Sequence, residues 1–268
     1  QLDYCSEKQI NEAMKGIDTL IHLAGPDAHT NSNDPESLIR QHIQLTGHLL
    51  RSAKVNSVKK FIYFSTIHVY GKNMKGTVTE ETNPIPVHPF AKAHLEAEGA
   101  VASQSKHIAA IIIRCANSFG APFFENEKCW TLVVNDLCKS AFRNGRLIIN
   151  SSGQSYRNFI AADDVVRAIH HLLELNNKRG FHDIYNLGSS NTVRIIDIAK
   201  KIQKELQDSF DYDCPIEMKK SLTENNKEDS FIFSIKKILQ TGFRTDYSDK
   251  EISSLTGYCR LKYHLDKN

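Results

Sequence analysis

Short apolar runs alternate with amphipathic stretches along most of this chain. The runs expected to form strands are 18–25, 61–65, 107–114, 146–150 and 183–188. They are rich in β-branched and aromatic residues and too short for buried helices, so composition and length together favour strands. Strands that alternate with helices along a chain are typical of α/β folds built on a parallel sheet.

The intervening stretches repeat their apolar residues with the spacing of a helix. Helices are expected over 6–15, 35–53, 130–144, 165–175, 192–206 and 255–265. A further stretch of helical composition, HPFAKAHLEAE, places Phe90, His94 and Glu98 four residues apart, and therefore along one face. The chain as a whole therefore predicts a sheet flanked by helices, with a less regular region over 121–160.

Composition sets limits on the function. The chain has 268 residues, of which 40% are hydrophobic, and a formal net charge of +3. This predicts a globular chain with one large domain, or with one domain and a smaller lobe. Basic and acidic residues are interspersed, so no nucleic-acid partner is indicated, and no apolar run is long enough to cross a membrane. A cytoplasmic protein is expected.

The cysteine pattern points to reduced thiols. The six cysteines are at positions 5, 115, 129, 138, 214 and 259, and none forms a C-x-x-C pair. Scattered cysteines without paired spacing favour neither a disulfide framework nor a zinc site. We therefore expect no bound metal.

Thr66 directly follows the strand expected at 61–65. In an open α/β sheet, the carboxyl ends of the parallel strands form the crevice where ligands bind, so a hydroxyl at this point is a candidate site residue. The alternative is a threonine that only ends the strand or caps the next turn.

The segments FSTIHVYG and HPFAKAHLEAE resemble the extended short-chain dehydrogenase/reductase family, the NAD-dependent nucleotide-sugar epimerases and dehydratases. That family has a Ser or Thr after this strand, then Val-Tyr-Gly, then a Pro-Tyr pair with Lys four residues beyond the Tyr and Glu four beyond the Lys. Thr66, Pro89 and Glu98 fit that pattern. The resemblance implies a partial Rossmann-type parallel sheet that lacks its first strands, with a smaller C-terminal α/β substrate lobe.

Two catalytic positions of the resembled family are substituted. Phe90 stands in the place of the tyrosine, and His94 in the place of the lysine. The family's tyrosine moves the substrate proton, and phenylalanine has no proton to move, so the chemistry is lost or another residue performs it. A protonated His94 would hold the cofactor ribose or act as the base. The alternative is a structural histidine on a partly buried helix face.

A second alignment of the same segment keeps a lysine. It puts Lys92 in the lysine position and His88 in the tyrosine position, but it loses the matches at Pro89 and Glu98. We therefore prefer the first alignment, in which the candidate catalytic residues are Thr66, Phe90 and His94.

The resemblance also implies a cofactor, NAD or NADP. Its contacts would come from Ala24, Gly25, Ser65, His94 and Cys115. For Ala24 and Gly25 the alternative is a tight turn between a strand and a loop. The family cradles the pyrophosphate in a G-x-x-G-x-x-G turn, and no stretch of this chain supplies one. We therefore expect residues 1–268 to be a truncated or incompletely covered piece of a longer protein.

Two further motifs imply a substrate site. RCANSFG resembles the family's R-x-x-N-x-[YF]-G, and YRNFIAADDV resembles its R-D-F-I-x-V-D-D-V. By this resemblance Asn117 and Arg157 would bind the diphosphate of a nucleotide sugar. The alternative for Arg157 is a surface ion pair with Asp163 or Asp164, and these two aspartates are expected to cap the helix 165–175.

The motifs divide the chain into two expected domains. Residues 1–120 would form an incomplete dinucleotide-binding domain, and 121–268 mainly a substrate-binding lobe, with 155–185 returning to the first. The leading hypothesis is an enzyme of the epimerase/dehydratase class that acts on a nucleotide-activated sugar, in a cytoplasmic homodimer and, in bacteria, in polysaccharide synthesis. The alternatives are a non-catalytic protein that binds the nucleotide sugar, and an unstable gene fragment.

Overall fold

The computed structural model divides the chain into two compact units. The residues it describes are 6–25, 34–124, 127–175, 179–219, 229–246 and 248–263. Unit 1 comprises Gln1–Met74, Thr79–Cys115 and Glu174–Leu187. Unit 2 comprises Lys75–Val78, Ala116–Leu173 and Gly188–Asn268.

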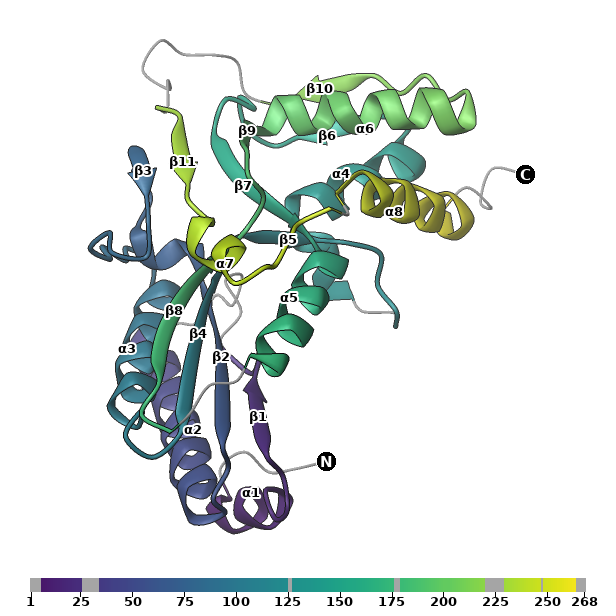
Figure 1. The fold of residues 1–268 in the computed structure, drawn as a ribbon. Helices are drawn as coiled ribbons and strands as arrows, with labels where there is room; N and C mark the ends of the chain where they lie inside the picture. The colour runs from purple at the N-terminus through teal and green to yellow at the C-terminus, as the bar shows by residue number, and fades with distance from the viewer. Residues whose placement is uncertain are drawn as a thin grey trace. The chain divides into compact units, whose positions relative to one another are not determined.

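Unit 1 is built on a parallel sheet of four strands. Its strands, in spatial order, are β1 (Thr19–His22), β2 (Lys60–Thr66), β4 (Ala109–Cys115) and β8 (His182–Leu187). Figure 1 shows them running side by side. The two central strands carry fully buried side chains such as Phe61 and Ile112, as near-continuous apolar runs in parallel sheets require. The predicted α/β fold with a parallel sheet is confirmed.

The helices of unit 1 follow the predicted apolar stripes. They are α1 (Glu7–Ala13), α2 (Pro35–Val55) and α3 (Pro89–Ser103), with a 3₁₀ turn, η1, at Ile67–Tyr70. Ser6 caps α1 and Asp34 caps α2, each through its side-chain oxygen. Helices α2 and α3 pack against each other, as Figure 1 shows, and α3 also contacts β2 and β4. This places the inward face of α3 against the central strands.

The described residues of unit 2 form three small sheets. One contains β5 (Asn117–Phe119), β7 (Tyr156–Ala161) and β9 (Thr192–Arg194); β6 (Leu147–Ile149) pairs with β10 (Ile216–Met218), and β3 (Gly76–Val78) with β11 (Phe231–Phe233). Only the β7–β9 pairing is antiparallel among these. The strands β3, β5, β7, β9, β10 and β11 were not predicted from the sequence.

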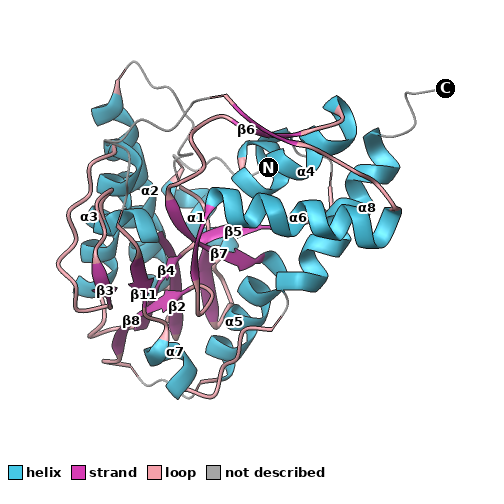
Figure 2. Cartoon of the chain, turned by 90° about the horizontal axis from the view of Figure 1, so that it is seen from above, coloured by secondary structure: helices cyan, strands magenta, loops and turns pink. Residues whose placement is uncertain are grey.

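The helices of unit 2 enclose a second apolar core. They are α4 (Val133–Asn144), α5 (Ala162–Glu174), α6 (Ile195–Phe210), α7 (Lys236–Gln240) and α8 (Ser248–Tyr263), with a 3₁₀ helix, η2, at Glu127–Thr131. Helices α4, α6 and α8 pack on one another, and α4 and α6 also contact β6, as Figure 2 shows. Phe142, Leu206 and Leu255 are buried in the core between them.

Several predicted helix starts were wrong. The helix expected over 192–206 begins only at Ile195, because Thr192 and Val193 pair with β7 as a strand. The β-branched residues at these positions favour that pairing. The helix expected over 255–265 begins earlier, at Ser248.

The expected capping role of the aspartate pair is also corrected. Helix α5 starts at Ala162, so Asp163 and Asp164 lie inside its first turn rather than before it. Asp164 is buried, accepts hydrogen bonds from the backbone N–H of Asp246 and pairs with Arg167. Carboxylates in a first turn still interact favourably with the helix dipole.

The division of roles between the units stays a prediction. In the structure, the segment that rejoins unit 1 is Glu174–Leu187, which is shorter than the expected 155–185. Among the described helices, none combines the length and the apolar character needed to span a bilayer.

Candidate functional site

Thr66 ends β2 and is largely buried, with 8% of its surface exposed. Its Oγ1 accepts a hydrogen bond from the backbone N–H of His68 at 3.3 Å, so it caps η1, as the alternative reading of this residue expected. In the register of the sheet it lies opposite Cys115. Burial raises the pKa of the Cys115 thiol to about 12, so this thiol stays protonated at neutral pH. A catalytic role of Thr66 remains a prediction.

Phe90 lies in the first turn of α3. The helix begins at Pro89, and His88 Nδ1 accepts a hydrogen bond from the Phe90 N–H at 3.3 Å. The Phe90 ring stands edge-on to His94, with the ring centroids 4.7 Å apart. His88 therefore serves as the N-cap of the helix, and Lys92 points to the surface. The position that holds tyrosine in the resembled family carries an aromatic ring without a hydroxyl.

His94 belongs to a buried polar cluster, which we call the histidine cluster. Its members are His22, His42, Thr46, Tyr63 and His94, each at most 7% exposed. The Tyr63 hydroxyl lies 2.7 Å from His94 Nδ1 and 2.7 Å from His42 Nε2. His22 Nε2 lies 3.0 Å from Thr46 Oγ1, which donates to the carbonyl of His42. Of these five residues, only His94 was predicted as a site residue from the sequence.

The histidine cluster is uncharged at neutral pH. Burial, together with smaller contributions from the neighbouring His42, His22 and His68, lowers the pKa of His94 to about 3, although a hydrogen bond with the backbone of Phe64 opposes this shift. The pKa of His22 falls to about 3 and that of His42 to about 4, again mainly through burial. Burial raises the pKa of the Tyr63 phenol above its ordinary value. Burial therefore disfavours the protonated form of His94 and favours the alternative of a structural histidine, and its catalytic role stays a prediction.

Gly25 lies directly against the histidine cluster. A Cβ atom on Gly25 would stand 3.2 Å from His94 Cε1 and 3.3 Å from His42 Cε1. The structure thus brings together two positions predicted to bind the cofactor, Gly25 and His94. It also gives a second reason for a glycine here, because the two imidazole rings occupy the space beside it. The neighbouring Ala24 is exposed.

Ser65 is tied to a second buried cluster, which we call the arginine cluster. Its hydroxyl donates to Glu98 Oε1. Arg114 donates from Nη2 to Glu98 Oε2 at 2.7 Å and from Nε to both carboxylate oxygens, and both side chains are 4% exposed. The ionised pair compensates its own burial, and the pKa of Arg114 stays above its ordinary value although desolvation alone would lower it.

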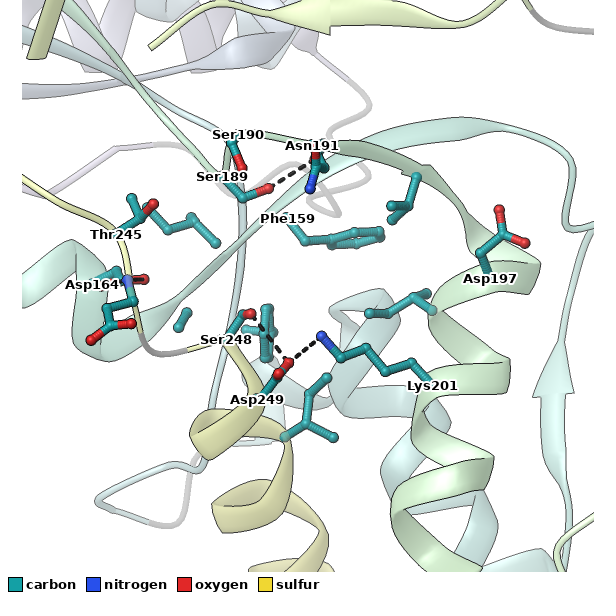
Figure 3. A pocket seen from close by; sticks show the side chains of 17 residues that line it. Phe159, Asp164, Ser189, Ser190, Asn191, Asp197, Lys201, Thr245, Ser248 and Asp249 are labelled. Atoms are coloured by element: carbon teal, nitrogen blue, oxygen red, sulfur yellow. Dashed lines mark hydrogen bonds and ion pairs between the residues drawn. The ribbon is translucent and has the colours of Figure 1, made fainter. Parts of the chain in front are cut away.

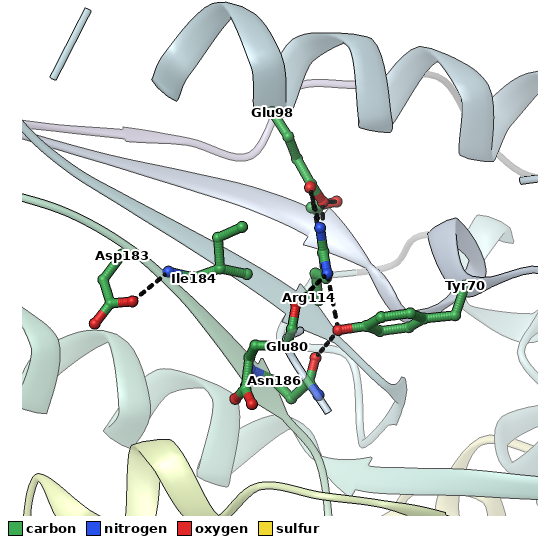
Figure 4. A network of polar contacts seen from close by, with 8 residues as sticks. Tyr70, Glu80, Glu98, Arg114, Asp183, Ile184 and Asn186 are labelled. Carbon is green, nitrogen blue, oxygen red and sulfur yellow. Dashed lines mark hydrogen bonds and ion pairs between the residues drawn. The ribbon is translucent and has the colours of Figure 1, made fainter. Parts of the chain in front are cut away.

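The arginine cluster extends to the ends of other elements, as Figure 4 shows. Arg114 Nη1 donates to the Tyr70 hydroxyl at 2.9 Å, and Tyr70 donates to Asn186 Oδ1 at 2.7 Å. Asn186 in turn donates its backbone N–H to Glu80. Desolvation raises the pKa of Tyr70 to about 12 against the opposing effect of Arg114. Strands β2, β4 and β8 are thereby fixed to one another and to α3 at their carboxyl ends.

Asn117 and Arg157 lie on neighbouring strands of unit 2. Asn117 is opposite Phe159 in the β5–β7 register, two residues along the chain from Arg157. The Asn117 amide donates to the carbonyl of Asn158 at 2.8 Å, and Arg157 Nη1 donates to the carbonyl of Tyr156 at 2.7 Å. The two predicted substrate residues thus share one sheet. Thr66, Phe90 and His94 belong to unit 1, so a cavity common to both groups stays a prediction.

Unit 2 also contains a cavity that sequence analysis did not anticipate (Figure 3). Its volume is about 400 Å³, and its lining includes Phe159, Asn191, Asp197, Lys201 and Asp249. Lys201 and Asp249 form an ion pair within it. Among the described residues that line this cavity, neither Asn117 nor Arg157 occurs. In the part of the chain that the structure describes, no group of three or more potential ligands could hold a metal ion.

Comparison with known proteins identifies relatives of the chain. Residues 1–188 match the profile of the NAD dependent epimerase/dehydratase family. The chain is 30% identical over 200 residues to dTDP-D-glucose 4,6-dehydratase of Dictyostelium discoideum, across 69% of this chain and 44% of that protein. It is 30% identical over 190 residues to dTDP-D-glucose 4,6-dehydratase of Homo sapiens, across 69% of this chain and 52% of that protein. The chain therefore spans about half the length of these relatives.

Solved structures share the fold. RMD from Pseudomonas aeruginosa, complexed with NADPH, superposes with a TM-score of 0.82 at 18% identity, covering 98% of this chain and 88% of that one. UDP-glucuronic acid 4-epimerase from Bacillus cereus, in complex with UDP-glucuronic acid and NAD, gives a TM-score of 0.78 at 24% identity, covering 95% and 79%. At such identities the likeness shows the fold alone.

Proposed function

The chain belongs to the NAD dependent epimerase/dehydratase family, and from this premise we propose that it forms part of an NAD- or NADP-dependent enzyme acting on a nucleotide-activated sugar. The observation that carries the proposal is the match over residues 1–188, a span that includes every candidate site residue. Among the proteins named above are two dTDP-D-glucose 4,6-dehydratases and a UDP-glucuronic acid 4-epimerase, which support a nucleotide-sugar substrate.

The residues present fit a dinucleotide in part. The exposed Ala24 and Gly25 follow β1 at the carboxyl edge of the sheet, next to His94, where a ligand can approach the backbone closely. The chain has no glycine-rich turn for the pyrophosphate. A bound NAD or NADP would supply the hydride acceptor. In this proposal Ala24, Gly25, Ser65, His94 and Cys115 line its site.

The substrate roles follow from the strand ends. Thr66 would hydrogen-bond the reacting sugar oxygen through its hydroxyl. Asn117 and Arg157 would hold the diphosphate, because an amide and a guanidinium both donate to phosphate oxygens. In the structure each of these side chains donates to a backbone carbonyl, which is a weaker acceptor than a diphosphate.

Phe90 limits the catalytic power that this site can have. The loss of a positioned acid or base typically reduces the rate by about 10²–10⁴-fold. We therefore expect slow turnover of a nucleotide sugar by this chain. The test is the double variant Phe90→Tyr with His94→Lys, assayed for product by chromatography with UDP- and dTDP-sugars. A large gain in turnover supports the proposal, and no gain shows that these substitutions do not limit the reaction.

A second candidate is a non-catalytic protein that binds the nucleotide sugar. This candidate is favoured by the pair Phe90 and His94, in which the phenylalanine has no proton to transfer and the neighbouring histidine is neutral. Thermal shift and nicotinamide fluorescence separate the two. Binding of both NADH and a UDP-sugar supports the enzyme, whereas binding of the sugar nucleotide alone supports the second candidate. The cytoplasmic setting, the homodimer and the role in polysaccharide synthesis stay predictions.

A further inference from the structure

The Tyr63 hydroxyl lies between two imidazole nitrogens. It is 2.7 Å from His42 Nε2 and 2.7 Å from His94 Nδ1. A phenol has one proton to donate, and a neutral imidazole has one N–H and one bare nitrogen. Tyr63 therefore donates to one histidine and accepts from the other. The tautomers of His42 and His94 are linked through this single hydroxyl.

The tautomer of His22 follows directly from its partner. Thr46 Oγ1 is 2.9 Å from the carbonyl of His42, which can only accept, so the Thr46 proton is used in this contact. His22 Nε2 is 3.0 Å from the same Oγ1 and must donate to it. His22 thus carries its proton on Nε2, and the first histidine of the cluster has one defined tautomer.

The tautomer of His42 follows from an unpaired atom. His42 Nδ1 is buried and has no hydrogen-bond partner among the described residues. If Tyr63 donated to His42 Nε2, the proton of His42 would sit on Nδ1 as a buried, unpaired N–H. If His42 Nε2 donates to Tyr63, only a lone pair is left unpaired. A buried N–H without a partner is rarer than a buried lone pair without one. His42 Nε2 is therefore the donor to Tyr63.

With His42 as the donor, the proton of Tyr63 points to His94. His94 Nδ1 then accepts, and the remaining ring nitrogen, Nε2, carries the proton. His94 also forms a hydrogen bond with the backbone of Phe64, so this single N–H is shared between that backbone group and any ligand on the Gly25 side. Nε2 is on the Gly25 side of the ring, 3.4 Å from the position that a Cβ on Gly25 would take. Burial keeps all three rings neutral at neutral pH, so the one-proton count applies to each.

We propose that Tyr63 and His42 hold His94 as the neutral Nε2–H tautomer, so that His94 offers a hydrogen-bond donor on the Gly25 side to a hydroxyl oxygen such as that of a ribose. The choice of ligand rests on the proposed function, whereas the tautomer does not. Tyr63 is a positioning residue, because it acts through His94.

The Nε2–H tautomer of His94 excludes one catalytic role. A general base needs a bare nitrogen facing the substrate, and the outward nitrogen of His94 already holds a proton. His94 therefore does not replace the missing tyrosine as the base. It keeps one property of the lysine that the resembled family has here, the ability to donate a hydrogen bond, without its charge.

The tautomers can be observed directly. The chain, labelled with ¹⁵N in its histidines, is examined by two-bond ¹H–¹⁵N correlation at pH 7.5, with His94→Gln and His42→Gln to assign the signals. We expect a protonated Nε2 and a bare Nδ1 for both His94 and His42. A proton on Nδ1 of His94 would overturn the proposal.

Tyr63→Phe tests the positioning role. The variant removes the donor to Nδ1, so the Nδ1–H form of His94 should increase severalfold. Tyr185→Phe is the matched control, since Tyr185 is a buried tyrosine on β8 outside the histidine cluster, and it should leave the His94 signals unchanged. A His94 tautomer that is the same in Tyr63→Phe as in the wild type contradicts the role of Tyr63. If Tyr63→Phe does not fold, the wild-type spectrum alone decides the tautomer.

A titration with NADH separates this inference from the proposed function. A shift of the His94 Nε2 signal on NADH binding supports the ligand assignment. NADH binding without that shift overturns it. If the expected tautomer is found and NADH does not bind, the tautomer stands and the proposed use of a nicotinamide cofactor by this chain fails.

Discussion

The histidine cluster and the arginine cluster are two successive contacts between the same strand and the same helix. On β2, Tyr63 and Ser65 are two residues apart and lie on the same face. On α3, their partners His94 and Glu98 are one turn apart on one face. Both contacts are buried, yet one is neutral and the other is ionised. Arg114 makes the difference, because it supplies Glu98 with a counter-charge that His94 lacks. Burial alone therefore does not decide the charge of a group.

The largest effect is expected from breaking the arginine cluster. Arg114→Met leaves Glu98 buried without its counter-charge, which should lower the free energy of unfolding by about 3–5 kcal/mol. The matched control is Lys204→Met, which removes an exposed ion pair with Asp208 and should change stability far less, because solvent screens the pair. Urea denaturation of both variants measures this. Equal losses of unfolding free energy in the two variants would show that the buried ion pair stabilises the fold no more than an exposed one.

The histidine cluster should make stability depend on acid. The folded-state pKa of His94 is about 3, below the ordinary value of 6.5, so the unfolded chain takes up a proton first as the pH falls. Stability from this residue is complete above pH 6.5 and is lost towards pH 3, by about 1.4 kcal/mol per pH unit. Urea midpoints measured from pH 7 to 5 should fall less steeply in His94→Gln. An identical slope in both proteins would contradict a neutral, buried His94.

Removing the central hydroxyl of the histidine cluster should have a smaller effect. Tyr63→Phe leaves the ring in place but deprives two buried nitrogens of their partner, which should lower the free energy of unfolding by about 1–3 kcal/mol. Tyr185→Phe again serves as the control for loss of a phenol on the same sheet. A Tyr63→Phe variant as stable as the wild type would mean that the two imidazoles find other partners.

The smallest effect is expected at Gly25. Gly25→Ala brings a methyl group to 3.2 Å from His94 Cε1, so the ring must yield by a few tenths of an ångström. We expect a loss of roughly 1 kcal/mol, within the usual range for overpacking. His94→Ala should restore tolerance of Gly25→Ala, and a thermodynamic cycle on the four proteins measures this coupling. If the stability changes of Gly25→Ala and His94→Ala are additive, Gly25 is not energetically coupled to the histidine cluster.

Most strands of the unit 1 sheet and part of the candidate site could be predicted from the sequence. The strand run ending at Thr66 and the helix holding His94 were predicted within a few residues, because their apolar periodicity is strong. The contacts Tyr63–His94 and Ser65–Glu98 were missed. Tyr63 and Ser65 are two residues apart and so share one face of a strand, and His94 and Glu98 are four residues apart and so share one face of a helix. The position of Gly25 beside His94 depends on tertiary packing between segments far apart in the chain, which local patterns do not encode.

The same limit applies to the charge of His94. Its residue type is able to switch near neutral pH, but its pKa is set by neighbours that are remote in sequence, among them His22 and His42. The strand β9 was mistaken for the start of a helix for a related reason. Thr192 and Val193 are compatible with both structures, and their pairing with β7 decides between them.

The contact between Tyr70 and Asn186 has a consequence for the order of folding. These residues are 116 positions apart in the sequence, so the loop between them must close before the contact can form. We expect this closure to follow the transition state of unit 1. Asn186→Ala should then speed unfolding and leave the refolding rate nearly unchanged in stopped-flow experiments. Slower refolding would instead place β8 in the folding nucleus.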